Sequence, residues 1–352
     1  MNRFLLLLFS APLLIWLPSC SAIHGLYAST DSLPAPNSHM RQSALDRLTP
    51  TVRKDFEQLT GPRHRDLLAQ HEAVEQIPAQ FKRRLAVKTL KQPWDGLTEL
   101  ERQGLALADM AKGGAIDLPA LLDVLEAGMD RTSTFSQPVP LPTSSTHEHL
   151  LAFMTESLKQ AALHREKALT NLTQAERHFL FLHAQSIAEH FVPQISSLSN
   201  QANTRVKADL RFAELLEKQV DYASLLASAQ VLARLANERW LQQAAATWTI
   251  PLPISAVPPG VTGDVLLVHK TSYGLIIIGG PGPNTYEIET GIGLIIDLGG
   301  NDLYRGKIAA SAHESQGNAV VIDLAGNDTY TGAPLGLATG RLGVGLLIDH
   351  DG

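Results

Sequence analysis

Acidic and amide side chains recur at a fixed interval near the C-terminal end of the sequence. Residues 291–306 read GIGLIIDLGGNDLYRG and residues 317–332 read GNAVVIDLAGNDTYTG, so each landmark repeats after 26 residues. A third copy starts at Gly343. The repeated carboxylates and amides are Asp297, Asn301, Asp302, Asp323, Asn327, Asp328 and Asp349. Oxygen atoms repeated in this way can structure tight turns or bind a hard cation such as Ca²⁺.

The repeat predicts stacked strands and turns. An apolar run that ends in Asp and continues into Gly-Gly-Asn-Asp is typical of a strand followed by a tight turn. Neighbouring strands lie about 4.8 Å apart, and two carboxylates at that distance repel by roughly 3.5 kcal/mol at an effective dielectric constant of 20. Either backbone N–H groups of the turns or bound Ca²⁺ must compensate this repulsion. The sequence leaves both open, and Ca²⁺ is the one cofactor that it suggests.

The motif Gly-Gly-Asn-Asp-x-Tyr at residues 299–304, with its second copy at residues 325–330, resembles part of the hemolysin-type calcium-binding repeat. It departs from that family in its period and in lacking a Gly between the Gly pair and the Asn. The whole unit is also similar to tandem Gly- and Asp-rich repeats of exported bacterial proteins. The first resemblance implies Ca²⁺ ligands and the second a β-solenoid architecture without an implied activity.

A weaker copy precedes the two clear ones. Residues 274–286 end in Asn284-Thr-Tyr286, with Ile278 where the first Asp belongs. A degenerate first unit is typical of a capping repeat. The third copy stops mid-motif at Gly352, which predicts that the natural chain continues.

The elements around the repeats predict an α+β multidomain protein. Helical spacing covers residues 44–249, with a Pro-, Ser- and Thr-rich linker at 131–146, and Thr173 with Glu176 forms a capping box. A hinge at 250–263 contains Ala256-Val-Pro-Pro-Gly260. Residues 264–352 are expected to form a right-handed parallel β-solenoid of about 26 residues per rung.

Charge is unevenly distributed along the chain. The formal net charge is −6, and residues 251–352 alone hold ten acids against four Lys or Arg. The rest of the chain is therefore balanced, and nothing is basic enough to bind nucleic acid.

The N-terminus carries an export signal. Arg3 precedes an apolar run to Leu17, and the run ends at Leu17-Pro-Ser-Cys20, which is similar to the lipobox of bacterial lipoproteins. Cys20 is the only cysteine, so we expect it to be the lipidation site after a signal peptide at 1–20, with a tether at 21–43. The expected location is the bacterial envelope, on the outer membrane. Simple secretion after cleavage behind Ala22 is the alternative.

Two functions fit these features. The first is a non-enzymatic envelope or secreted protein whose acidic solenoid binds a glycan, a ligand or a protein partner, with contact to the membrane only through the lipid anchor. The alternative is a polysaccharide lyase or hydrolase on a parallel β-helix. Catalytic carboxylates in such enzymes break the repeat, whereas the acids here obey it. His313 and Glu314 break the repeat and are the weak catalytic candidates.

Overall fold

The computed structural model describes two compact units of the chain. One unit comprises residues 1–16 and 133–352, and the other residues 17–132. The residues described are 4–8, 52–55, 57–58, 93–112, 118–128, 138–190, 200–251, 256–289, 292–311 and 313–351. Residues 131–137 of the predicted linker, the whole predicted tether and Cys20 lie outside them. None of the described helices combines the length and the apolar character needed to cross a bilayer.

The unit of residues 17–132 contains two described long helices. These are α4 (Pro93–Lys112) and α5 (Leu118–Gly128). The side chains of Leu118 and Leu122 on α5 are buried, because residues four apart lie on one face of a helix.

The larger unit begins with a helical layer. Its helices are α6 (His147–Ala168), α7 (Gln174–His190), α8 (Asn200–Gln219), α9 (Tyr222–Ala233) and α10 (Glu238–Thr247), with a short 3₁₀ turn at Arg234–Ala236. The predicted capping box is confirmed, because Glu176 Oε2 accepts from Thr173 N at 3.0 Å and Thr173 Oγ1 accepts from Glu176 N at 3.3 Å. The helical spacing of the sequence predicts one helix from Tyr222 to Trp248. The structure corrects this prediction, because the helix is interrupted and the backbone is extended at Asn237.

The second part of this unit is a mostly parallel sheet. Its strands are β2 (Val261–Thr271), β3 (Gly274–Ile288), β4 (Ile292–Asp297), β5 (Leu303–Ile308), β6 (Ala319–Asp323), β7 (Thr329–Leu337) and β8 (Gly345–Asp349), and β1 (Phe4–Leu8) pairs antiparallel with β8. The strand order is β1-β8-β6-β4-β3-β5-β7, with β2 antiparallel to β3. The predicted α+β class is therefore correct.

The long strand β3 divides the sheet into two arms. Its first half pairs with β4, and its second half pairs with β5. One arm continues through β6 and β8, and the other through β7. Apolar side chains from both arms, including Ile295 of β4 and Ile308 of β5, form one core between them. The bent sheet is barrel-like, with this core inside.

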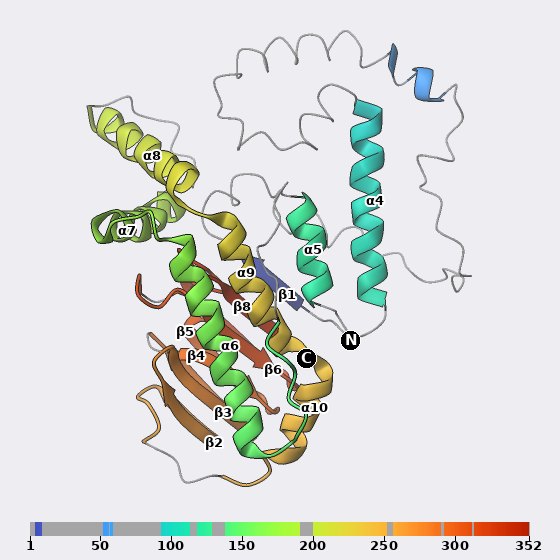
Figure 1. Ribbon diagram of the computed structural model, residues 1–352, viewed down its shortest axis with the longest axis vertical. Coiled ribbons are helices and arrows are strands. Elements are labelled where there is room, and N and C mark those ends of the chain that lie inside the picture. The colour runs from blue at the N-terminus through green and yellow to red at the C-terminus, as the bar shows by residue number, and fades with distance from the viewer. Residues whose placement is uncertain are drawn as a thin grey trace. The chain divides into compact units, whose positions relative to one another are not determined.

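The first arm is buried on both faces. Because successive strand residues point to opposite faces, Ile295 and Asp297 face the core between the arms, and Leu294 and Ile296 face the helices. All four are 0% exposed. Helices α6 and α9 contact each other along this outer face (Figure 1).

Two buried arginines join the helices to the sheet. On α6, Arg165 donates from Nε to the carbonyl of Leu342 at 2.5 Å and from Nη2 to the carbonyl of Glu314. Arg341 donates to the carbonyl of Phe181 on α7 at 3.3 Å, with its guanidinium 3.7 Å from the centre of the Phe181 ring. Carbonyl groups of Leu342 and Glu314 in the sheet region, and of Phe181 on α7, thus receive charged donors, which makes these bonds stronger than neutral ones.

Candidate functional site

The repeated acids and tyrosines form continuous columns in the core between the arms. Strand pairing aligns Asp297 with Asp323 and Asp323 with Asp349. It likewise aligns Tyr304 with Tyr330, so the 26-residue spacing predicted these partners correctly. We call the set the acid–tyrosine ladder, and its members are Tyr286, Asp297, Asp302, Tyr304, Asp323, Asp328, Tyr330 and Asp349.

The tyrosine rings stack on one another. Ring centroids are 4.9 Å apart for Tyr286 and Tyr304, and 4.8 Å apart for Tyr304 and Tyr330. The planes are nearly parallel, with angles of 17° and 8°. The strand spacing of the parallel arm dictates this separation.

Both carboxylate oxygens of Asp297 accept hydrogen bonds, and the donors come from three places in the chain. Its Oδ2 accepts from the Tyr286 hydroxyl at 2.5 Å and from Asn284 Nδ2 at 2.9 Å, and its Oδ1 accepts from Gly299 N at 2.9 Å. The residue is 0% exposed. The buried carboxylate of Asp297, with its three donors, thus closes the turn that follows β4.

The same arrangement recurs one repeat later. Asp323 Oδ2 accepts from the Tyr304 hydroxyl at 2.6 Å, and its Oδ1 accepts from Ala325 N at 3.2 Å. In the third copy the bonding is incomplete, because the Tyr330 hydroxyl and Asp349 Oδ1 are buried without a hydrogen-bond partner among the described residues. The ladder is therefore most regular around Asp297 and Asp323.

The second acidic column links one repeat to the next. Asp302 Oδ1 accepts from Asn284 N at 2.6 Å, and Asp328 Oδ1 accepts from Asp302 N at 2.7 Å. Outside the core, Asn301 Oδ1 accepts from Asn327 N at 2.9 Å. Each of these side chains holds a backbone amide of an adjacent turn, which is the turn-structuring role expected of Asp and Asn.

The strand pairing of the first, degenerate repeat differs by one residue from the alignment predicted from the sequence. The register places Gly279, and not Ile278, opposite Asp297. The step from this repeat to the next is 18 residues, as the pair Asn284 and Asp302 shows. A Cβ at Gly279 would collide with Asp297 Oδ2 and the Tyr286 hydroxyl. The missing carboxylate thus leaves space that Asp297 itself and the Asn284 amide occupy.

None of the ion pairs of the described lysines and arginines includes a carboxylate of the ladder. Burial raises the pKa of Asp302 to about 7 and that of Asp323 to about 8, and it also raises the pKa of Asp297. Neighbouring carboxylates, those of Asp297 and Asp328, raise the pKa of Asp302 further. No described lysine or arginine is among the main causes of these three shifts. Protons or a bound cation must therefore neutralise the cluster.

The cluster has some of the features of a cation site. Asp297, Asp302 and Asp323 each offer an oxygen within 4.8 Å of the others. Asp302 Oδ2 and Asp328 Oδ2 are buried and accept no hydrogen bond from described residues. Ca²⁺ takes six to eight oxygens, and all four carboxylate oxygens of Asp297 and Asp323 already receive hydrogen bonds. The residues present fit a partial ligand set. The exposed Asn301 is engaged elsewhere, because its Oδ1 accepts from the backbone N of Asn327.

The weak catalytic candidates lie apart from the ladder. Glu314 Oε2 is 2.8 Å from Nδ1 of His178 on α7, and the ring centroid of His313 is 6.4 Å from that of Phe181. Nδ1 of His313 is 2.9 Å from Ser315 Oγ. Since the Glu314 carbonyl also accepts from Arg165, this loop holds the helices against the sheet.

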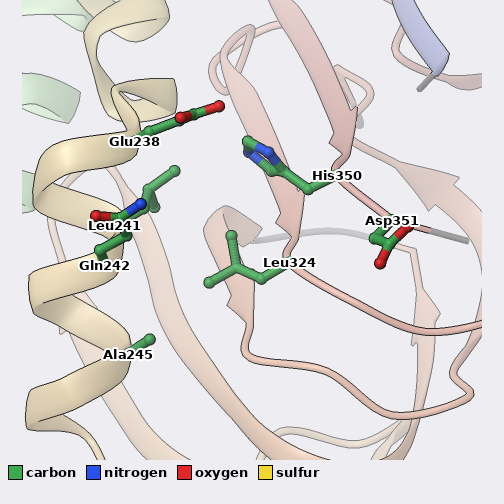
Figure 2. Close-up of a pocket in the computed structure, with 7 residues that line it drawn as sticks. All are labelled: Glu238, Leu241, Gln242, Ala245, Leu324, His350 and Asp351. Atoms are coloured by element: carbon green, nitrogen blue, oxygen red, sulfur yellow. The ribbon is translucent and has the colours of Figure 1, made fainter. Parts of the chain in front are cut away.

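A pocket opens on the helical side of the same turns. It has a volume of about 330 Å³ and lies between α10 and the turns that follow β6 and β8 (Figure 2). We call it the α10 pocket, and its lining residues are Glu238, Leu241, Gln242, Ala245, Leu324, His350 and Asp351. Strand alternation places Asp323 in the core and Leu324 toward α10, so ladder and pocket share turns but face opposite ways.

The sequence does not predict the residues of the α10 pocket or the role of Asn284 in binding Asp297. Glu238, Leu241, Gln242 and Ala245 are spaced for one helix face, which the pattern contains, but nothing local indicates that the turns lie opposite. The role of Asn284 could have been predicted only by aligning it with Asp302, the equivalent residue of the next repeat. Comparisons with protein-family models, with curated proteins and with solved structures give no match.

Proposed function

We propose that this chain is a non-enzymatic binding protein of the bacterial envelope, built on a right-handed parallel β-solenoid. In this interpretation the two arms of the sheet are two faces of the solenoid, and each 26-residue repeat is one rung. The proposal depends on one observation: the repeated carboxylates are enclosed in the core, where Asp297 and Asp323 are 0% exposed and accept hydrogen bonds from tyrosines and turn amides. These acids build the scaffold, and the α10 pocket remains for a ligand.

Burial of the repeated acids argues against the alternative, a polysaccharide lyase or hydrolase. A general acid or base must reach within hydrogen-bond distance of its substrate, and an enclosed carboxylate cannot meet a polymer chain. The catalytic candidate Glu314 is held in other contacts, because its carboxylate pairs with His178 and its carbonyl accepts a hydrogen bond from Arg165.

An activity measurement separates the two functions. The full chain is incubated with neutral and uronic-acid polysaccharides, while unsaturated products and new reducing ends are monitored. We expect no turnover above the rate of a heat-inactivated sample. Turnover that disappears in the His313→Ala/Glu314→Gln double variant, with folding intact by circular dichroism, would establish the enzyme instead.

Ca²⁺ is a second proposal for the same ladder, supported by the orphaned Oδ2 atoms of Asp302 and Asp328. Bound between repeats, Ca²⁺ would replace protons as the neutralising charge for Asp297, Asp302 and Asp323. Its role there is structural, because these side chains face the core.

Attachment to the envelope depends on the N-terminal segment. The lone Cys20 behind the apolar run supports a lipid anchor on the outer membrane, with secretion as the alternative. Mass spectrometry of the mature protein distinguishes them: a diacylglyceryl-modified Cys20 at the N-terminus supports the anchor, and an unmodified N-terminus at Ile23 supports secretion.

A further inference from the structure

We propose that the α10 pocket binds a small organic cation, a primary ammonium group carried on a compact apolar body. This inference rests on the proposed binding function, because it names the ligand class for that site. The volume of about 330 Å³ is at the lower end of the range for small-molecule sites, about 300–1,000 Å³. A ligand of one ring or a short chain therefore fits, and a polymer segment does not.

The charges around the pocket select a cation. Glu238 and Asp351 supply carboxylates, and among the described residues that line the pocket there is no lysine or arginine. An anionic ligand would meet two like charges, whereas an ammonium group would be attracted.

The position of the polar groups sets the orientation of the ligand. Glu238, in the first turn of α10, and the ring of His350 point toward one another across the opening (Figure 2). Asp351 lies on the far side, on the turn after β8. The ammonium group is thus placed between α10 and that turn, within reach of a carboxylate oxygen and of the His350 ring.

The apolar side chains define the rest of the ligand. Leu241 and Ala245 on α10 and Leu324 on the turn after β6 form an apolar wall, against which a ring or an alkyl chain gains the free energy of burial. Gln242 adds one amide. A bare metal ion uses none of this wall, and no set of three ligands including Glu238, His350 or Asp351 is clustered closely enough among the described residues.

A matched series of probes tests the ligand class. Cyclohexylamine, cyclohexanol and cyclohexanecarboxylate share a ring and differ in charge, and each is titrated into the full chain while protein resonances are followed by NMR. We expect the amine to bind at least tenfold more tightly than the alcohol, with the carboxylate not binding. Equal affinity of the amine and the alcohol would overturn the inference.

Two variants locate the site. Glu238→Gln should weaken amine binding at least tenfold, whereas Glu148→Gln, which removes a charge from the first turn of α6, should leave it unchanged. Ala245→Leu fills the pocket and should abolish binding of every probe. Equal losses in Glu238→Gln and Glu148→Gln would reduce the effect to general charge and overturn the inference.

The same experiment separates the ligand class from the proposed function. A fragment library is screened against the wild-type chain and Ala245→Leu. If neutral fragments bind and Ala245→Leu blocks them while amines do not bind, the ligand class is wrong and the binding function stands. If no fragment binds in a way that Ala245→Leu blocks, the binding function at this pocket fails as well.

Discussion

The Tyr304 hydroxyl donates a hydrogen bond of 2.6 Å to Oδ2 of Asp323 in the core of the sheet. The two residues come from different arms, Tyr304 from β5 and Asp323 from β6. The bond therefore ties the arms together through the apolar core. Its counterpart in the preceding repeat joins Tyr286 and Asp297 at 2.5 Å.

Removing one tyrosine hydroxyl tests this link. Tyr304→Phe leaves Asp323 Oδ2 without its donor in a buried site, which costs about 1–3 kcal/mol. We expect the free energy of unfolding, measured by urea denaturation, to fall by that amount. Tyr273→Phe, in the turn between β2 and β3 and outside the ladder, is the control and should change stability by less than about 0.5 kcal/mol. Equal effects of the two changes would contradict a structural role for the ladder.

The stability of the sheet should fall as the pH rises. Burial raises the pKa of Asp302 to about 7 and of Asp323 to about 8, above the ordinary value of 3.8. Between these values the folded state binds more protons than the unfolded state, so each group lowers the free energy of unfolding by up to about 1.4 kcal/mol per pH unit. Without divalent cations, we expect a higher melting temperature at pH 5.5 than at pH 8.5.

A double substitution isolates the contribution of the second acidic column. Asp302→Asn/Asp328→Asn removes two charges and keeps an oxygen acceptor for the backbone amides of Asn284 and Asp302. The fall in melting temperature between pH 5.5 and 8.5 should become smaller in this variant. A pH dependence identical to that of the unmodified chain would assign the titration to groups outside this column.

Ca²⁺ should act only where the cluster is ionised. At pH 8.5 a hundredfold excess of Ca²⁺ over its Kd stabilises the fold by about 2.7 kcal/mol, and at pH 5.5 protons occupy the carboxylates instead. Thermal melts with Ca²⁺ and with chelator at both pH values provide the measurement. Asp302→Asn/Asp328→Asn should abolish the effect. Identical melting temperatures with and without Ca²⁺ at pH 8.5 would leave protons and hydrogen bonds as the sole compensation.

Proteolysis at the predicted hinge should nick the chain without separating its parts. Ala256 and Val257 are exposed, and we expect cleavage there. The fragments should still co-elute in gel filtration, because Arg165 and Arg341 bind helices to loops of the sheet region. Arg165→Met leaves the Leu342 carbonyl without this donor and should weaken the association. Separation of the fragments in the unmodified chain would show that these contacts do not hold the layers.

The parts of the fold that repeat could be predicted, and those that depend on distant packing could not. The columns of Asp297 with Asp323 and Tyr304 with Tyr330 follow from a constant interval. The partner of Asp297 in the first repeat was misplaced by one residue, because that step is 18 residues. The break at Asn237 was missed because Asn and the residues around it are compatible with a continuous apolar pattern.

The candidate sites divide in the same way. Asp302 and Asp323 were recognised as chemically important from their types, but their enclosure required knowledge of the opposite arm. The α10 pocket combines a helix face at Glu238 with turns more than eighty residues further along the chain, at Leu324 and His350. No local pattern connects such segments, since only the packing of the helices on the sheet brings them together.

The constant step between the later strands bears on how genes for such chains can change in length. Gly317 stands 26 positions after Gly291, and β6 pairs with β4 at this interval. In-frame duplication or loss of one whole unit therefore returns every inward side chain to an inward position, with a tyrosine again above a tyrosine. A change by an odd number of residues within a strand would exchange its two faces and turn the inward carboxylate toward the helices. Unequal recombination between neighbouring units is thus tolerated by the same geometry that makes single-residue slips costly.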